Sequence, residues 1–149
     1  MKISAKDEYA CLAVLDLAMN YDADLPIRVH DIAKRQGIPM KFLFQIMQIL
    51  KRMDLVRSKR GTEGGYVLAR PPGRITVGDV IRFVSGPYIQ LSCLDSDNFS
   101  RECNWKRSCE FKPIWAEVDR AIGSVLDAVT FEELARRAKA GAGRLMYHI

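Results

Sequence analysis

The stretch RVHDIAKRQGIPMKFLFQIMQILKRM, residues 28–53, decides the fold of this chain. Residues 28–37 predict a short amphipathic helix that Gly37 ends, since glycine accepts the left-handed backbone that closes many helices. After Ile-Pro, apolar residues at helical spacing predict a longer helix over about 40–53. Two helices joined by a glycine-containing turn predict a helix-turn-helix.

The segment LVRSKRGTEGGYVLA, residues 55–69, predicts a β-hairpin directly after these helices. Two short β-prone segments, near 55–58 and 65–69, flank a loop that contains three glycines. A hairpin in this position is the wing of a winged helix-turn-helix.

Helices on both sides complete the predicted fold, which is mainly α with this small hairpin. The expected ranges are about 5–20, 76–84, 113–129 and 130–139, the second and fourth opened by the capping pairs Thr76–Asp79 and Thr130–Glu133. The chain is then expected to divide into a winged helix-turn-helix at 1–86, a cysteine-bearing connection at 87–110, a dimerisation helix with a short helix after it at 111–139, and a flexible tail at 140–149.

Length and composition place the chain among globular proteins. It has 149 residues, 48% apolar and 28% charged, which suits one compact domain or a domain with an appended arm. Acidic residues near the N-terminus interrupt any secretory signal, and no run of about 18 apolar residues is present. We therefore expect a cytoplasmic protein without a membrane partner.

The net charge of +5 is concentrated in one block. Residues 34–60 carry eight Lys and Arg residues against a single carboxylate, Asp54. Such a block is either a solvated face or a surface for nucleic acid.

The helix at 40–53 has the chemistry of a DNA-reading helix. Four polar residues form a stripe about 60° wide, opposite an apolar face that would anchor the helix. Glutamine can pair with adenine in the major groove, and Lys or Arg can reach guanine or phosphate. The alternative is an ordinary amphipathic helix followed by a solvated hairpin. The DNA-binding candidates are Lys41, Gln45, Gln48 and Arg52 on the helix, with Lys41 and Gln45 nearest the bases, and Arg57, Lys59 and Arg60 on the wing, with Arg60 at the minor groove or a phosphate.

The last long helix carries an apolar heptad seam. Its residues recur at spacings of 4, 3, 4, 3 and 4, which is typical of a coiled-coil contact. The seam can pack within one chain, but a winged helix reads few base pairs and symmetric dimers reading two half-sites are the usual solution. We therefore predict a homodimer on palindromic double-stranded DNA, with a seam of Phe111, Trp115, Val118, Ile122, Val125 and Val129.

Three of the four cysteines, Cys93, Cys103 and Cys109, lie in the polar connection, spaced C-x9-C-x5-C. A connection of this length needs a function or a ligand to order it. Thiolates suit iron-sulfur clusters, whereas structural zinc sites favour C-x(2–4)-C knuckles, which are missing here. A zinc site, a disulfide switch from Cys93 to Cys103 or Cys109, and inert cysteines remain alternatives.

An enzyme is not expected. The sequence has no phosphate loop, no H-E-x-x-H motif and no Ser/His/Asp grouping. A pure interaction module with a zinc-stabilised loop is the main alternative to a DNA-binding sensor, and salt-dependent binding to a palindromic duplex would separate them.

The motifs DIAKRQGI, RSKRGTEGGYVLAR, ITVGDVIRFVSGP and TFEEL, with MKIS at the N-terminus and the three-cysteine loop, resemble the IscR/NsrR/CymR (Rrf) family of winged-helix transcription regulators. The resemblance covers nearly the whole chain. It implies a dimeric repressor or activator that senses iron-sulfur supply, oxidants, nitric oxide or sulfur status. It also implies a 2Fe-2S or 4Fe-4S cluster held by the loop cysteines, although the interval between Cys93 and Cys103 is longer than the family's common one.

The resemblance implies a fourth, non-cysteine ligand. Some relatives place a His three residues after the last cysteine, where this chain has Lys112. Others use a carboxylate near the N-terminus of the opposite subunit, and Glu8 stands at that position with Asp7 beside it. Cys11, one turn further along the same helix, is a possible substitute.

The chain ends in Met146, Tyr147, His148 and Ile149. A free apolar C-terminus after a Gly-Ala stretch is a peptide that a pocket can capture, or simply a frayed end. CymR-like members have a similar ending, and the resemblance implies docking of that tail into cysteine synthase. A cluster-free regulator of sulfur metabolism, controlled by a thiol switch or by this tail, is therefore the alternative function.

Overall fold

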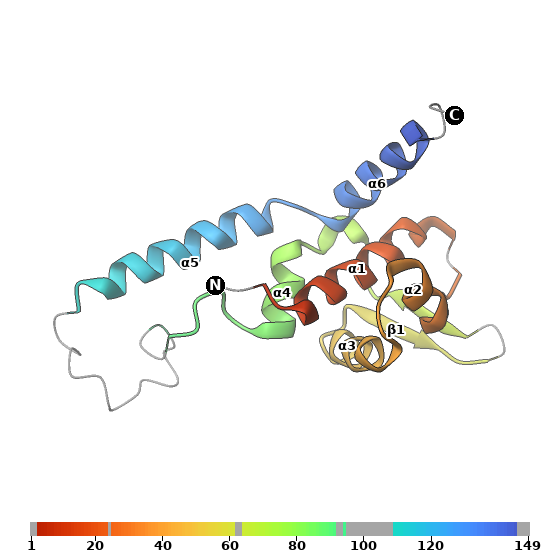
Figure 1. The fold of residues 1–149 in the computed structure, drawn as a ribbon, viewed down its shortest axis with the longest axis horizontal. Helices are drawn as coiled ribbons and strands as arrows, with labels where there is room; N and C mark the ends of the chain where they lie inside the picture. Colours follow the sequence, from red (N-terminus) through yellow and green to blue (C-terminus); the bar gives the residue numbers. More distant parts are fainter. Residues whose placement is uncertain (1–2, 24, 62–63, 92–93, 95–108, 146–149) are drawn as a thin grey trace.

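The computed structural model describes residues 3–23, 25–61, 64–91, 94 and 109–145, and the predictions for Cys93, Cys103 and the four tail residues lie outside them. The described part is mostly helical with a two-stranded antiparallel hairpin, as predicted (Figure 1). The elements are α1 (Ala5–Met19), η1 (Tyr21–Ala23), α2 (Val29–Gln36), α3 (Met40–Arg52), β1 (Val56–Lys59), β2 (Gly65–Leu68), η2 (Pro72–Arg74), α4 (Val77–Ser85), α5 (Phe111–Asp127) and α6 (Phe131–Leu145).

Helix α1 lies at the centre of the core. It packs against α2, α3, α4, α6 and β2, and small or branched residues on several of its sides are buried. A capping box between Ser4 and Asp7 fixes its first turn. Because α1 contacts α2 and α3 as well as α6, it connects the helix-turn-helix with the C-terminal part of the fold.

The helix-turn-helix forms as the sequence predicts. Gly37 ends α2 with a φ of +64°, a left-handed conformation that favours glycine. The apolar side of α3 is anchored in the core, where each residue is at most 1% exposed. These core residues are Leu43, Ile46, Met47 and Leu50.

The wing is hydrogen-bonded to the segment that precedes α2. β1 and β2 pair with Val56 opposite Leu68 and Lys59 opposite Gly65. Tyr66 also exchanges two backbone hydrogen bonds with Ile27, of 2.8 and 2.9 Å. A Cβ on Gly65 would come within 2.4 Å of the Ile27 carbonyl oxygen, so the glycine permits this approach.

The two C-terminal helices differ from each other. α5 extends away from the rest of the fold and packs mainly against α4, and none of its residues is buried (Figure 1). α6 packs against α1 and η2. The prediction that this helix ends at about Lys139 is wrong, because α6 continues to Leu145. Residues 140–145 are helical rather than part of a flexible tail, because extending an existing helix adds a hydrogen bond per residue, although Gly141 and Gly143 each disfavour helix by about 1 kcal/mol relative to alanine.

Candidate functional site

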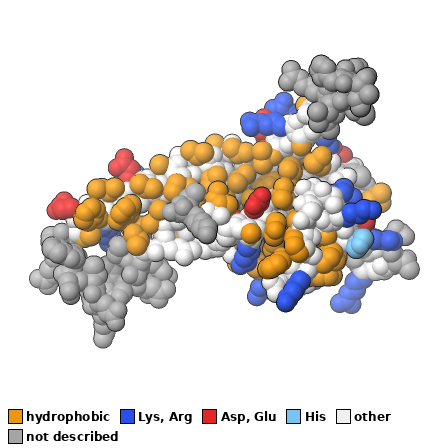
Figure 2. All heavy atoms as spheres, viewed as in Figure 1, with side chains coloured by type: hydrophobic (Ala, Val, Ile, Leu, Met, Phe, Trp, Pro, Cys, Tyr) orange, Lys and Arg blue, Asp and Glu red, His pale blue; other side chains and the backbone are white. Residues whose placement is uncertain are grey.

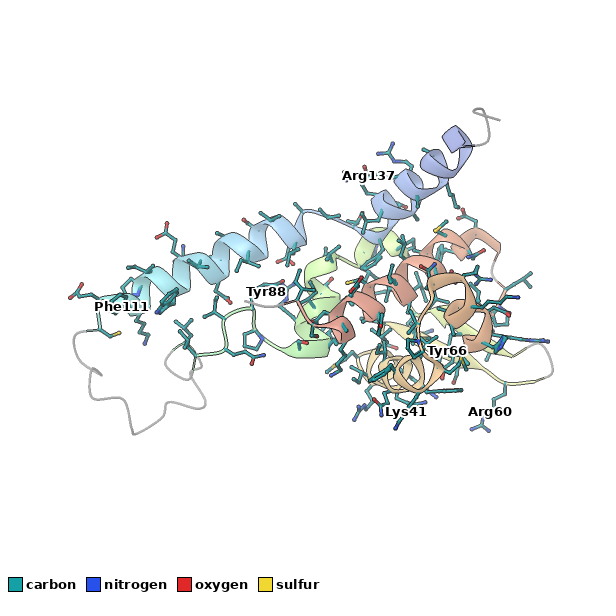
Figure 3. The ribbon with its side chains drawn as sticks, in the orientation of Figure 1. Lys41, Arg60, Tyr66, Tyr88, Phe111 and Arg137 are labelled. Atoms are coloured by element: carbon teal, nitrogen blue, oxygen red, sulfur yellow. The ribbon has the colours of Figure 1, made fainter. Side chains whose placement is uncertain are left out.

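The polar face of α3 is exposed at every predicted reading position. The side chains of Lys41, Gln45, Gln48 and Arg52 are all exposed, on the side opposite the buried anchor. The helix carries no acidic residue, so nothing on it would repel a phosphate backbone. Lys41 and Arg60 of the hairpin project from the same edge of the molecule (Figure 3).

The exposed basic residues of the hairpin continue this surface. Arg57, Lys59 and Arg60 are all exposed. Lys51 of α3 donates from Nζ to Ser58 Oγ at 2.9 Å, which ties the helix to β1. Basic side chains gather around the end of the molecule that holds α3 and the hairpin (Figure 2).

A buried carboxylate fastens α2 to α1. Asp16 is 2% exposed and accepts from Arg35 Nε at 3.0 Å and from Arg35 Nη2 at 2.7 Å. Gln36 Nε2 donates to the same carboxylate at 3.0 Å. The hydrogen bond from Arg35 to Asp16 raises the pKa of the guanidinium. Sequence reasoning missed this pair, because charged residues on separate helices show no pattern along the chain.

A second buried carboxylate, Asp7, joins α1 to α4. It is 3% exposed, caps α1 through Ser4, and accepts from Ser85 Oγ at the end of α4. Lys6 Nζ donates to the Val84 carbonyl at 3.0 Å beside it. Burial alone would raise the pKa of Asp7, but hydrogen bonds from Ser85 and Ser4 hold that pKa below its ordinary value. The Ser4-x-x-Asp7 spacing of a capping box was the signal that could have found it.

The segment that leads into the cysteine connection is fixed to α4 and α5. Arg82 of α4 donates to Tyr88 Oη at 2.7 Å and to Asp127 of α5 at 2.9 Å. The Ile89 amide donates to Asp119 of α5 at 2.9 Å. Burial raises the pKa of the Tyr88 phenol despite the neighbouring guanidinium. The start of the connection is therefore held by Arg82 of α4 and by Asp119 of α5.

The predicted ligands lie at different places. Cys109 is half-buried and comes just before α5 begins. Glu8 is exposed, and with Cys11 and Leu126 it lines an apolar pocket of about 280 Å³. Burial and then the charge of Asp7 raise the pKa of the Cys11 thiol to about 11. No group of three His, Cys, Asp or Glu side chains comes together within the described ranges.

Five of the six predicted seam residues form an apolar stripe along α5 (Figures 2 and 3), whereas Val129 lies beyond the end of this helix at Asp127. Phe111, Trp115, Val118 and Val125 are exposed, and Ile122 and Val129 are half-buried. Ile114, which was not in the predicted seam, is exposed on the same side.

The comparisons with known proteins agree with this geometry. The model of the Rrf2 family, described as an iron-dependent transcriptional regulator, matches residues 3–137. The chain belongs to the Rrf2 family. It is therefore a transcription regulator of a DNA-binding family and not an enzyme, as the resemblance implied. No helix in the described part of this Rrf2 chain has the length and apolar character needed to cross a membrane.

Two named regulators show how far the likeness extends. IscR of Xenorhabdus nematophila is 33% identical over 136 residues, which cover 91% of this chain and 80% of that protein. CymR of Bacillus subtilis is 30% identical over 149 residues, the full length of both. Among solved structures, T. potens IscR matches with a TM-score of 0.73 and 33% identity over 93% of this chain and 88% of that one. The B. subtilis CymR structure, that of the global cysteine regulator of this organism, matches with a TM-score of 0.70 and 32% identity over 92% and 98%.

Proposed function

We propose that this Rrf2 regulator is a homodimeric repressor that binds palindromic DNA and senses iron-sulfur, redox, nitric oxide or sulfur status through a cluster on Cys93, Cys103 and Cys109. The observation that carries the proposal is the combination of two surfaces in one chain. One is a polar, carboxylate-free face on a firmly anchored α3, and the other is an apolar stripe on α5 that the described chain does not cover.

The α3 face supports docking in the major groove. Its exposed side chains are those that pair with base edges and phosphates, and the wing brings Arg60 to the same edge of the molecule (Figure 3). The buried side of α3 anchors this face in the core, and the bidentate Asp16–Arg35 pair fastens the preceding helix α2 to α1. An anchored helix supports sequence reading because its backbone has little freedom left to lose on binding.

The contacts of α5 within the chain leave its seam uncovered. α5 meets α4 and the segment after it through Asp119, Gly123 and Asp127, which share one side of the helix. The seam residues lie on a neighbouring side, and Val125 is 66% exposed. A second copy of the same helix would bury this stripe, which supports a symmetric dimer.

The chemistry of the donors supports a cluster of iron and sulfide. Cys109 is accessible at the start of α5, and a cluster there would supply a group that changes with iron supply and oxidants. Cys11 is less suitable as a ligand, since ligation requires a thiolate and its raised pKa opposes deprotonation.

The position of Glu8 supports the proposal that the fourth ligand of the cluster comes from the opposite subunit. Glu8 lies near Leu126 at the far end of α5, whereas Cys109 precedes the first turn. Fifteen helical residues separate these ends, about 22 Å at 1.5 Å per residue. An antiparallel pair of α5 helices would bring Glu8 of one subunit toward Cys109 of the other.

The test is anaerobic purification followed by a visible spectrum and counts of iron, acid-labile sulfide and zinc. We expect sulfide-to-iron absorption bands, loss of iron in Cys109→Ser, and retention of iron in the matched variant Cys11→Ser. Glu8→Gln should change the spectrum while leaving the protein folded and dimeric. A colourless protein that iron and sulfide cannot reconstitute would remove the cluster from this proposal.

The alignment with CymR over the full length of both chains favours a second candidate. That CymR is a global cysteine regulator, which connects this branch of the family with sulfur metabolism. In this alternative the chain binds the same DNA without a cluster, under control of a thiol switch or of Met146, Tyr147, His148 and Ile149 docked into cysteine synthase. A peptide RLMYHI that fails to bind cysteine synthase would exclude the tail, and DNA affinity unchanged by oxidation would exclude the switch.

A further inference from the structure

Phe44 of α3 is exposed beside the polar stripe. The residue is 47% exposed and lies outside the buried core cluster of the described chain. It follows Lys41 by three positions and precedes Gln48 by four, so it is their neighbour on the helix surface. A large exposed apolar side chain therefore borders a face that is otherwise built for polar contacts.

Phe42 on the same helix provides a direct comparison. It is 53% exposed, but it lies about 160° around the helix from Phe44. Its ring is 6.5 Å from that of Tyr9 on α1, in a tilted arrangement. Phe42 thus has an aromatic neighbour in the fold and flanks the stripe about 60° beyond Gln45, whereas Phe44 flanks it on the other side, about 40° from Gln48.

The major groove offers one apolar group to such a side chain. The base edges there carry hydrogen-bond donors and acceptors, and the 5-methyl group of thymine is the exception. We propose that Phe44 is a specificity residue that reads a thymine methyl group beside the bases contacted by Lys41 and Gln48. The inference rests on the proposed docking of α3 in the major groove and adds a base preference that its polar residues do not supply.

The experiment separates the methyl group from the rest of the base. Full-length protein is used to select duplexes from a random pool, and each thymine of the enriched site is then replaced by deoxyuridine, which lacks only the methyl. Fluorescence anisotropy at fixed salt gives the affinity of the wild type, Phe44→Ala, Phe44→Leu and the matched control Phe42→Ala. Circular dichroism confirms that each variant is folded.

We expect one thymine per half-site at which deoxyuridine weakens the wild type about fourfold, the value of one buried methyl group. Replacement in both half-sites should then cost about fifteenfold. Phe44→Ala should lose this sensitivity, Phe44→Leu should retain part of it, and Phe42→Ala should behave as wild type. Equal deoxyuridine profiles in the wild type and Phe44→Ala would overturn the role of Phe44 but not the proposed docking of α3 in the major groove. A pool in which no sequence is enriched would instead overturn the proposed DNA reading, and this inference with it.

Discussion

Helices α3 and α5 both expose large apolar side chains, but only α3 is anchored in the core. Four apolar residues of α3 are buried to 1% exposure or less, so its outer face rests on a finished structure. α5 buries no residue, and Phe111 at its start is 64% exposed. The difference indicates that α3 is complete in one chain, whereas the exposed stripe of α5 is the surface that the proposed dimer would cover.

The largest expected effect is the loss of the dimer when a charge is placed in the α5 seam. Val125→Arg puts a guanidinium where we expect the partner's apolar side chains, twice in each dimer, so the dimerisation constant should fall roughly a thousandfold. Analytical ultracentrifugation at micromolar concentration should then detect monomers, with weakened binding to a palindromic duplex.

The matched control is Ser124→Arg, one residue earlier and on another side of α5. Ser124 is exposed and donates to the Ala121 carbonyl within its own helix. This variant should stay dimeric. Equal dissociation of both variants, or of neither, would show that the seam is not the dimer contact.

Local patterns predicted the α3 region well. Helical periodicity identified both the exposed polar stripe and the buried anchor, because both depend on positions within one helix. Likewise, Thr76–Asp79 forms the expected capping box. In the Thr130–Glu133 pair the Thr130 hydroxyl accepts from the Glu133 amide at 3.3 Å, while the Glu133 carboxylate pairs with Arg136 and Arg137.

Contacts between distant segments could not be predicted in the same way. Asp16 meets Arg35, and Asp7 meets Ser85, only because α1 lies between α2 and α4 in space. Periodicity also did not show which apolar residues beside the stripe are exposed. Phe44 looks like a core residue until the structure shows which side of α3 is buried.

Removing Arg35 should weaken the α3 side without affecting the α5 side. Arg35→Ala leaves the Asp16 carboxylate buried with the Gln36 amide still donating to it, which should lower the free energy of unfolding by about 2 kcal/mol. Urea denaturation measures the change, and the dimer should persist. Lys34→Ala, an exposed neighbour on α2, should change stability by less than about 0.5 kcal/mol. A similar loss in both variants would argue against a specific role for the α1–α2 pair.

The Asp7–Ser85 junction, where α1 meets α4, should give a smaller effect that depends on pH. Ser85→Ala removes a hydrogen bond to a carboxylate, worth about 1.5–2 kcal/mol at neutral pH. Because the folded-state pKa of Asp7 lies below its ordinary value of 3.8, this stability is present above that value. It is lost as the pH falls through the lowered pKa.

Urea denaturation of the wild type and Ser85→Ala at pH 7, 5 and 3 tests the sign. The difference in unfolding free energy should be constant from pH 7 to pH 5 and should shrink at pH 3. Ser124→Ala, which changes an exposed serine, should follow the wild type at every pH. A difference that grows on acidification would mean that Asp7 is not the acceptor that stabilises the junction.

The smallest expected effect comes from removing one arginine of the wing. This change tests whether α3 and the wing together form the DNA-binding surface. Arg60→Ala should weaken duplex binding by about tenfold and reduce the slope of log K against log salt by about 0.9 for each phosphate that is no longer neutralised. Arg137→Ala removes the same charge from α6, far from Lys41 and Arg60 (Figure 3). It should leave that slope unchanged. If both variants lowered the slope equally, the attraction would come from net charge, and the geometry of α3 and the wing would not account for DNA binding.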